Sequence, residues 1–76
     1  MEPDRLVVGM KQSAKAIESG DAKKVYIAKD AEMSLTGKIE SLCNLKNVPV
    51  QYVETMSALG KMCNISVGAS VAVECI

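Results

Sequence analysis

The chain has 76 residues, too few for two independent hydrophobic cores, so we expect a single domain. Nine basic and nine acidic residues give a formal net charge of zero, which argues against nucleic-acid binding through bulk charge but allows a local basic patch. The hydrophobic fraction of 49% suits a globular core, which in the absence of Phe and Trp must consist of Val, Ile, Leu, Met and Ala.

The three cysteines and the lack of histidine limit the chemistry further. Cys43, Cys63 and Cys75 are widely spaced and include no CxxC pair, so neither a disulfide framework nor a zinc site is expected. Free thiols fit a reducing compartment. The N-terminal residues 1–5 lack the basic and apolar regions of a signal peptide, and no apolar run approaches the roughly 20 residues of a membrane span. We therefore expect a cytoplasmic protein without a membrane segment.

Sequence motifs for catalysis or cofactor binding are also missing. The chain has no nucleophile motif, no Walker loop and no GxGxxG fingerprint. Its acidic residues are scattered among expected turns and exposed helix positions, as on solvated surfaces. We therefore expect no enzymatic activity, no metal and no cofactor.

The first part of the chain predicts two strands separated by a helix. An apolar strand, Leu6–Val8, leads through Gly9 into a helical pattern from Met10 to Ser19. Gly20 is a suitable residue to follow the end of that helix. Lys24–Ala28 is rich in β-branched and aromatic residues and is bounded by charge, which predicts a second strand.

The middle of the chain predicts a longer helix and a third strand. Ser34 is a plausible N-cap, and Asn47 can end the helix in a left-handed conformation because Pro49 prevents its continuation. The expected buried stripe excludes Thr36 and consists of Leu35, Ile39, Leu42, Cys43 and Lys46. Val48–Val53 then reads as a strand with proline near its beginning.

The last part predicts a third helix and a final strand. Thr55 or Ser57 caps the helix, Asn64 closes it, and its apolar side consists of Met56, Leu59, Met62 and Cys63. Ala69–Cys75 is a strand too apolar on both sides for a solvated sheet edge. The alternation of strands and helices predicts an α/β fold in which helices cover both faces of a sheet.

The start of the first predicted helix gathers two lysines and an amide. Residues at i, i+4 and i+7 form its core face: Met10, Ala14 and Ile17. Lys11, Gln12 and Lys15 lie outside that face, at the end where free N–H groups and the helix dipole attract phosphate. They form either a solvated face or an anion-binding site. The second interpretation gains from the fact that cations are electrostatically disfavoured in the first turns of a helix.

Several segments, taken together and in this order, match a known sequence pattern: Val8–Ala16, Val25–Ala31, Val48–Val50, Met56–Cys63 and Val67–Ala72. The most specific are the G-x-K-Q-x-x-K stretch and the L-G-K-x-C helix. Together the segments resemble the kink-turn RNA-binding ribosomal protein superfamily of archaeal L-seven-Ae and eukaryotic L-thirty-e, and above all its small bacterial members. The resemblance covers nearly the whole chain from about Leu6. It implies a three-layer α-β-α sandwich around a mixed four-stranded sheet.

The resemblance also implies a function, which is binding to kink-turns in ribosomal RNA, a riboswitch or another structured RNA. In a kink-turn, the helix bends at a bulge beside sheared G·A pairs, and the opened major groove exposes guanine edges to side chains. Residues that match the contacting motif are Gly9, Lys11, Gln12 and Lys15. The loop of Ile65, Ser66, Val67 and Gly68 falls where the family contacts an extruded nucleotide. Lys29 and Lys61 are further candidates for phosphate contacts.

The chain departs from the family pattern at a few positions. Archaeal and eukaryotic members commonly have Asn-Glu in place of Lys11-Gln12, whose form is bacterial. Ser66 replaces a frequent acidic residue, and Asn64 replaces a glycine while keeping the left-handed role. The N-terminal helix of the family is reduced to residues 1–5.

Two alternatives to this function remain open at the sequence level. The domain could be a protein-interaction or regulatory module of the same fold, acting as a homodimer or with a partner, rather than a monomeric RNA binder. In the loop, Ile65 and Val67 could also fold back onto the third helix instead of contacting RNA.

Overall fold

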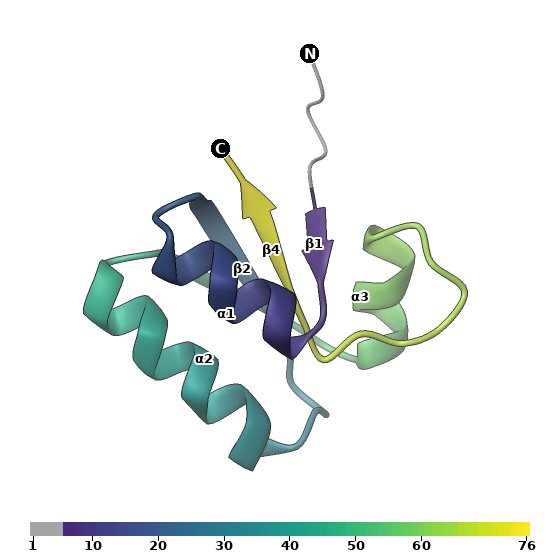
Figure 1. The fold of residues 1–76 in the computed structure, drawn as a ribbon. Coiled ribbons are helices and arrows are strands. Elements are labelled where there is room, and N and C mark those ends of the chain that lie inside the picture. Colours follow the sequence, from purple (N-terminus) through teal and green to yellow (C-terminus); the bar gives the residue numbers. More distant parts are fainter. Residues whose placement is uncertain (1–5) are drawn as a thin grey trace.

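A computed structural model of the protein describes residues 6–76 and shows one mixed sheet with helices on both faces (Figure 1). The expected order of elements and the expected sandwich are confirmed. The expectations for residues 1–5, about a signal peptide and a shortened helix, lie outside the described residues. The elements are β1 (Leu6–Val8), α1 (Met10–Glu18), β2 (Ala22–Ala28), α2 (Met33–Lys46), β3 (Val50–Val53), α3 (Met56–Met62) and β4 (Val71–Cys75).

The last strand lies in the interior of the sheet. The strand order is β1-β4-β2-β3, with β4 antiparallel to both of its neighbours and β2 parallel to β3. This position explains why β4 is apolar on both sides, because each of its faces is covered by a helix layer. The parallel pair is joined by α2, as parallel strands require a crossover connection.

Alternating side chains of β2 and β4 supply two separate cores. Val25 and Ile27 of β2, with Val71 and Val73 of β4, pack under α1 and α2. Ala28 and Ala72 point to the other face, where they pack with Leu59 of α3. The smaller residues lie on the side covered by the single short helix α3 (Met56–Met62).

The register of α2 differs from the sequence-based expectation. The helix begins at Met33 with Glu32 at the N-cap position, so Ser34 is an exposed residue of the first turn and caps nothing. Thr36, expected outside the buried stripe, is only 5% exposed, whereas Leu35 is 43% exposed. The Thr36 hydroxyl donates to the Glu32 carbonyl oxygen at 3.4 Å, and this local partner allows a polar residue to be buried.

The remaining residues of the stripe expected on α2 are also buried to different extents. Ile39 and Cys43 are buried as expected, Leu42 is half-buried, and Lys46 is exposed. In α3, Leu59 is buried but Met62 is 46% exposed, because the helix ends there and has only seven residues. Burial of a helix residue follows the contact with the sheet and the neighbouring helix, which hydrophobicity alone does not specify.

The ends of the elements follow local rules. Asn47 and Asn64 have φ of 59° and 61°, which confirms their left-handed role after α2 and α3. Thr55, not Ser57, caps α3, since its Oγ accepts a hydrogen bond from the Ala58 N–H at 3.0 Å. β2 starts two residues earlier than expected, at Ala22, where its pairing with β4 is irregular.

Three other elements also begin or end one or two residues away from the expected position. α1 stops at Glu18, β3 starts at Val50 and β4 starts at Val71. The cysteines are free thiols, with Cys43 buried and the other two half-buried. Within residues 6–76, no helix is long and apolar enough to cross a membrane.

Candidate nucleic-acid interface

Three chain segments meet at one end of the sheet. The Gly9 N–H donates to the Val71 carbonyl oxygen at 3.2 Å, and the Ala28 N–H donates to the Ser70 carbonyl oxygen at 3.0 Å. The start of α1, the β2–α2 connection and the last residues of the loop before β4 therefore lie side by side, at the lower end of the sheet in Figure 1. This proximity results from the position of β4 between β1 and β2.

Gly9 shapes the entrance to α1. Its φ of 105° lies in a region that residues with a side chain rarely adopt, so the turn from β1 into the helix requires glycine. Its carbonyl oxygen accepts the Ser13 N–H at 2.9 Å, which closes the first turn. No side chain caps the helix, and its first turn has no acidic residue. The positive end of the helix dipole is therefore left without a compensating carboxylate on the helix itself.

The three polar residues of α1 lie together on the outer side of this helix end. Lys11, Gln12 and Lys15 are exposed and line an open hollow of about 280 Å³. The opposite side of α1 is committed to the core through Ser13, Ala16 and Ile17. Neither lysine forms an ion pair within residues 6–76. The sequence-predicted cluster is therefore assembled, and its cations are available to an anion.

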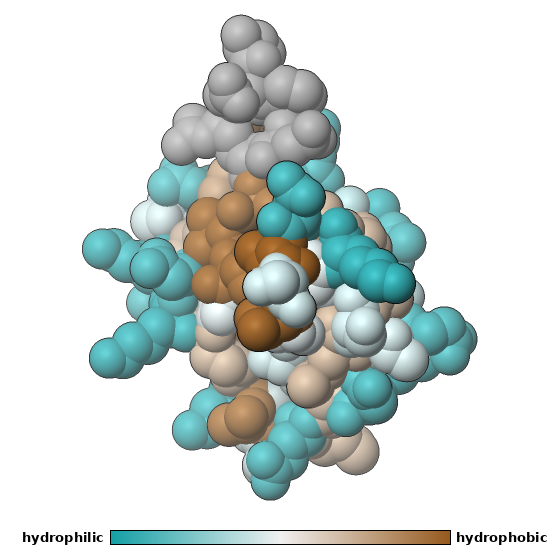
Figure 2. All heavy atoms as spheres, turned by 90° about the vertical axis from the view of Figure 1, so that its right-hand side faces the viewer, coloured by the Kyte–Doolittle hydropathy of each residue, from teal (hydrophilic) through white to brown (hydrophobic). Residues whose placement is uncertain are grey.

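The loop before β4 presents apolar side chains on a fixed backbone. Val67 is 68% exposed and is not folded away into α3, whereas Ile65 keeps 36% of its surface exposed. The backbone is held by two hydrogen bonds to α3, from the Ile65 N–H to the Gly60 carbonyl oxygen and from the Ala69 N–H to the Met56 carbonyl oxygen, both 3.0 Å. Figure 2 shows the side of the molecule that carries α3, where apolar side chains gather.

The other two lysines predicted to contact phosphate lie outside α1. The Lys29 ammonium lies 3.2 Å from a carboxylate oxygen of Glu54. Both side chains are exposed, so this ion pair is weak and a phosphate can replace it. Lys61 is exposed in the last turn of α3, next to Gly60, whose carbonyl oxygen accepts the Ile65 N–H of the predicted loop.

One residue of this region was missed by the sequence analysis. The Asp30 carboxylate accepts a hydrogen bond from the Met56 N–H at 2.8 Å and so ties the β2–α2 connection to the start of α3. A short acidic residue in a turn is a common helix cap, but here it caps a helix 26 residues further along the chain. No local sequence signal connects two such distant segments.

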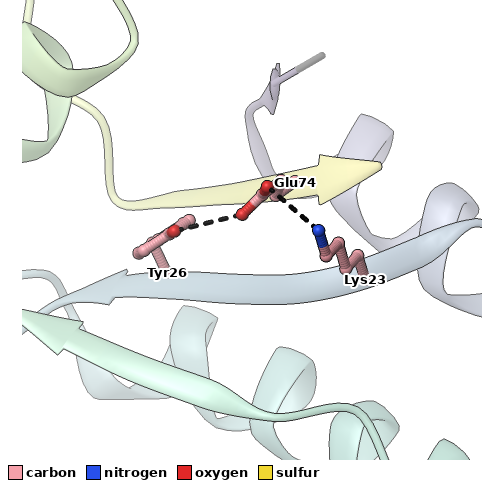
Figure 3. A network of polar contacts seen from close by, with 3 residues as sticks. All are labelled: Lys23, Tyr26 and Glu74. Carbon is pink, nitrogen blue, oxygen red and sulfur yellow. Dashed lines mark hydrogen bonds and ion pairs between the residues drawn. The ribbon is translucent and has the colours of Figure 1, made fainter. Parts of the chain in front are cut away.

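A second polar group lies on the α3 side of the sheet. Figure 3 shows Glu74 of β4 between Tyr26 and Lys23 of β2. The Tyr26 hydroxyl donates to Glu74 Oε1 at 3.2 Å, and Lys23 Nζ lies 3.9 Å from Glu74 Oε2. Burial, followed by the hydrogen bond to Glu74, raises the pKa of Tyr26. These contacts link the two central strands and are not part of the candidate interface.

A cleft of about 240 Å³ lies beneath the first half of α2, near the end of β3. Tyr52 and Glu40 line it, and the Tyr52 hydroxyl donates to the Glu40 carboxylate. This hydrogen bond is the main cause of a raised pKa of Tyr52. Among the described residues, no group of three or more His, Cys, Asp or Glu side chains could hold a metal ion.

Fold and surface together define a class: a small α-β-α domain with an uncapped basic helix start beside an exposed apolar loop. The chain belongs to the ribosomal protein L7Ae/L30e/S12e/Gadd45 family, whose model matches residues 1–75.

Relatives of known name are similar over most of their length. The chain is 45% identical to an RNA-binding protein of Caldanaerobacter subterraneus, covering 97% of this chain and 90% of the relative. It is 39% identical to the RNA-binding protein YbxF of Geobacillus stearothermophilus, covering 92% and 85%. Among solved structures, a 15.5kD RNA binding protein of Giardia lamblia superposes with a TM-score of 0.88 at 30% identity, over 93% of this chain and 60% of that one.

Proposed function

We propose that this protein binds RNA and that its target is a kink-turn. The observation behind the proposal is the cluster of Lys11, Gln12 and Lys15 at the uncapped start of α1, next to the exposed loop before β4. Membership of the family and the names of the relatives support RNA as the partner. The target kink-turn belongs to ribosomal RNA or to another structured RNA such as a riboswitch.

Each part of the surface has a matching part in a kink-turn. The helix N-terminus and the two lysines suit phosphate groups, which are negatively charged and accept hydrogen bonds from backbone N–H groups. The Gln12 amide has both a donor and an acceptor and can therefore bind a base edge. An ordinary RNA helix has a major groove too narrow for side chains, so the sharp bend is what admits them.

The apolar loop complements the basic cluster. A nucleotide extruded from the bulge offers a flat apolar face, and Ile65 and Val67 offer exposed apolar side chains on the loop whose last residues reach the sheet beside the start of α1. The protein as a whole has zero net charge, so its affinity for an uninterrupted duplex is expected to be low. Recognition thus depends on RNA shape more than on total charge.

The test compares three RNAs of equal length at matched salt: a kink-turn, the same RNA without its sheared G·A pairs, and a continuous duplex. We expect tight binding to the first RNA only, by a monomeric protein. Equal affinity for all three would refute kink-turn recognition, and no binding to any of them would refute RNA as the partner. The second result would favour the protein-interaction alternative. The mass of the free protein, measured by light scattering, tests the monomer separately.

A further inference from the structure

Gly60 of α3 lies where no side chain fits. It is buried, and a Cβ atom at this position would lie 2.1 Å from the carbonyl oxygen of Val67 and 3.1 Å from its carbonyl carbon. A carbon–oxygen contact of 2.1 Å is far inside van der Waals distance. The opposing atoms belong to the backbone and cannot move aside by changing a rotamer. Any residue other than glycine at position 60 must therefore displace the loop before β4 or the helix.

The contact is part of a packing site for the whole loop, formed on α3 by Met56 and Gly60 and called the seat below. The Gly60 carbonyl oxygen accepts the Ile65 N–H, and the Met56 carbonyl oxygen, one turn earlier on α3, accepts the Ala69 N–H, both at 3.0 Å. A Cβ at Gly68 would lie 3.2 Å from the Met56 Cβ, so the loop also fits closely here. The backbone of residues 65–69 thus rests on α3 at both ends, while Ile65 and Val67 remain exposed.

The second helical glycine of the chain provides the comparison. Gly37 lies within α2, and a Cβ there would meet nothing within 4 Å. Glycine inside a helix is less favourable than alanine, so both positions weaken their helices intrinsically. Only at Gly60 does the fold require the missing side chain, and the requirement comes from the loop.

We propose that Gly60 is a positioning residue that sets the place of the apolar loop, and through it the contact with an extruded RNA nucleotide. The proposal rests on the proposed function. Gly60 itself is buried beneath the loop and touches no RNA. Its effect on binding passes through Ile65 and Val67, whose location relative to α1 depends on the seat.

The test uses Gly60→Ala, with Gly37→Ala as the matched control. Both variants add one methyl group to a helical glycine, and only the first one clashes with the loop. In the free protein, we expect Gly60→Ala to speed the hydrogen exchange of the Ile65 and Ala69 amides, and Gly37→Ala to leave it unchanged. Unchanged exchange in Gly60→Ala would show that Gly60 does not hold the loop in place, whatever the protein binds.

The second readout isolates the loop contact with RNA. The probes are a kink-turn and the same RNA with an abasic site at the extruded nucleotide. Removing the base should weaken binding of the parent protein about tenfold, because the apolar contact between the base and the two loop side chains is lost. In Gly60→Ala this difference should nearly vanish, whereas Gly37→Ala and Gln12→Ala should retain it. If Gly60→Ala keeps the full difference, the positioning role is wrong.

A gentler variant covers the case in which Gly60→Ala does not fold. Gly68→Ala presses on the same seat from the loop side, with contacts of 3.2 and 3.3 Å to Met56 in place of 2.1 Å. It should show the same pattern at smaller amplitude. A Gly68→Ala variant with normal exchange and a full response to the abasic site would contradict the proposal. If the parent protein binds neither RNA, the proposed function is wrong. The exchange experiment would still show whether Gly60 holds the loop in place.

Discussion

At the scale of single residues, Gln12 and Lys15 are exposed on α1, away from its core side, so their truncation should leave the fold intact. Gln12→Ala should weaken kink-turn binding by roughly 1–3 kcal/mol with little change in salt dependence, because an amide releases no counterion. Lys15→Ala should weaken binding and also reduce the slope of log affinity against log salt by up to about one unit. Titrations at several salt concentrations measure both effects.

The control for this pair is Lys38→Ala, which removes an exposed lysine from α2. It should leave both affinity and salt slope unchanged. Lys11→Ala should follow Lys15→Ala if Lys11 contacts phosphate, and should change base preference if it contacts a base. Folded Gln12→Ala and Lys15→Ala proteins that bind as tightly as the parent would show that the cluster is only a solvated helix face.

The buried hydroxyl of Ser13 is unfavourable for the stability of the fold. Ser13 is fully buried in α1, and its hydroxyl has no hydrogen-bond partner among the described residues. Ser13→Ala removes this group and also suits the helix better, so we expect a gain of about 1 kcal/mol in unfolding free energy. The melting temperature should then rise by roughly 4–8 °C. The exposed Ser41→Ala serves as control, and a loss of stability in Ser13→Ala would contradict the expectation.

At the scale of elements, a distant side chain caps the first turn of α3 and ties it to the β2–α2 connection. Asp30 accepts the Met56 N–H and Thr55 accepts the Ala58 N–H, so two side chains satisfy helix N–H groups there. Asp30→Ala should reduce stability by about 1 kcal/mol, as expected for the loss of a cap. Asp30→Asn keeps an acceptor oxygen and should retain most of the parent's stability. Urea unfolding of the three proteins compares them, and equal loss in both variants would show that charge, not the cap, matters.

At the scale of the whole molecule, the pH dependence of stability should be confined to alkaline and acidic extremes, since the chain has no histidine. Folding raises the pKa of both tyrosines, Tyr26 mainly by burial and Tyr52 mainly by its hydrogen bond to Glu40. The folded protein therefore retains protons that the unfolded chain loses above the ordinary tyrosine pKa of 10.0. This stabilisation is fully present below pH 10 and decreases as the pH rises through the raised values.

Urea unfolding between pH 8 and 11 measures that decrease. We expect a steeper alkaline loss in the parent than in Tyr26→Phe or Tyr52→Phe, because each substitution removes one of the ionising groups. Burial also raises the pKa values of the Cys43 and Cys63 thiols, and these thiols are present in all three proteins, so the difference between parent and variant isolates the tyrosine. A loss as steep in both variants as in the parent would contradict the assignment.

The sequence by itself determined those features that depend on neighbouring residues. The alternation of β-branched runs with helical periods indicated the order of the elements. Asn47 and Asn64 were placed correctly because few other residues adopt a left-handed φ. Likewise, a strand as apolar on both faces as β4 had to be interior. The polar cluster at the start of α1 could also be recognised, since its spacing on one helix is a local property.

The tertiary structure decided what depends on contacts between distant segments. Strand order places the last residues of the loop before β4 beside the start of α1, and no residue of either segment specifies that order alone. The packing of α2 on the sheet buried Thr36 in preference to Leu35, although Leu35 is the more hydrophobic residue. The role of Gly60 depends on a backbone oxygen seven residues later, which reaches the helix only after the chain has turned back on itself. Such contacts form only between elements already in place, so local propensities could not reveal them.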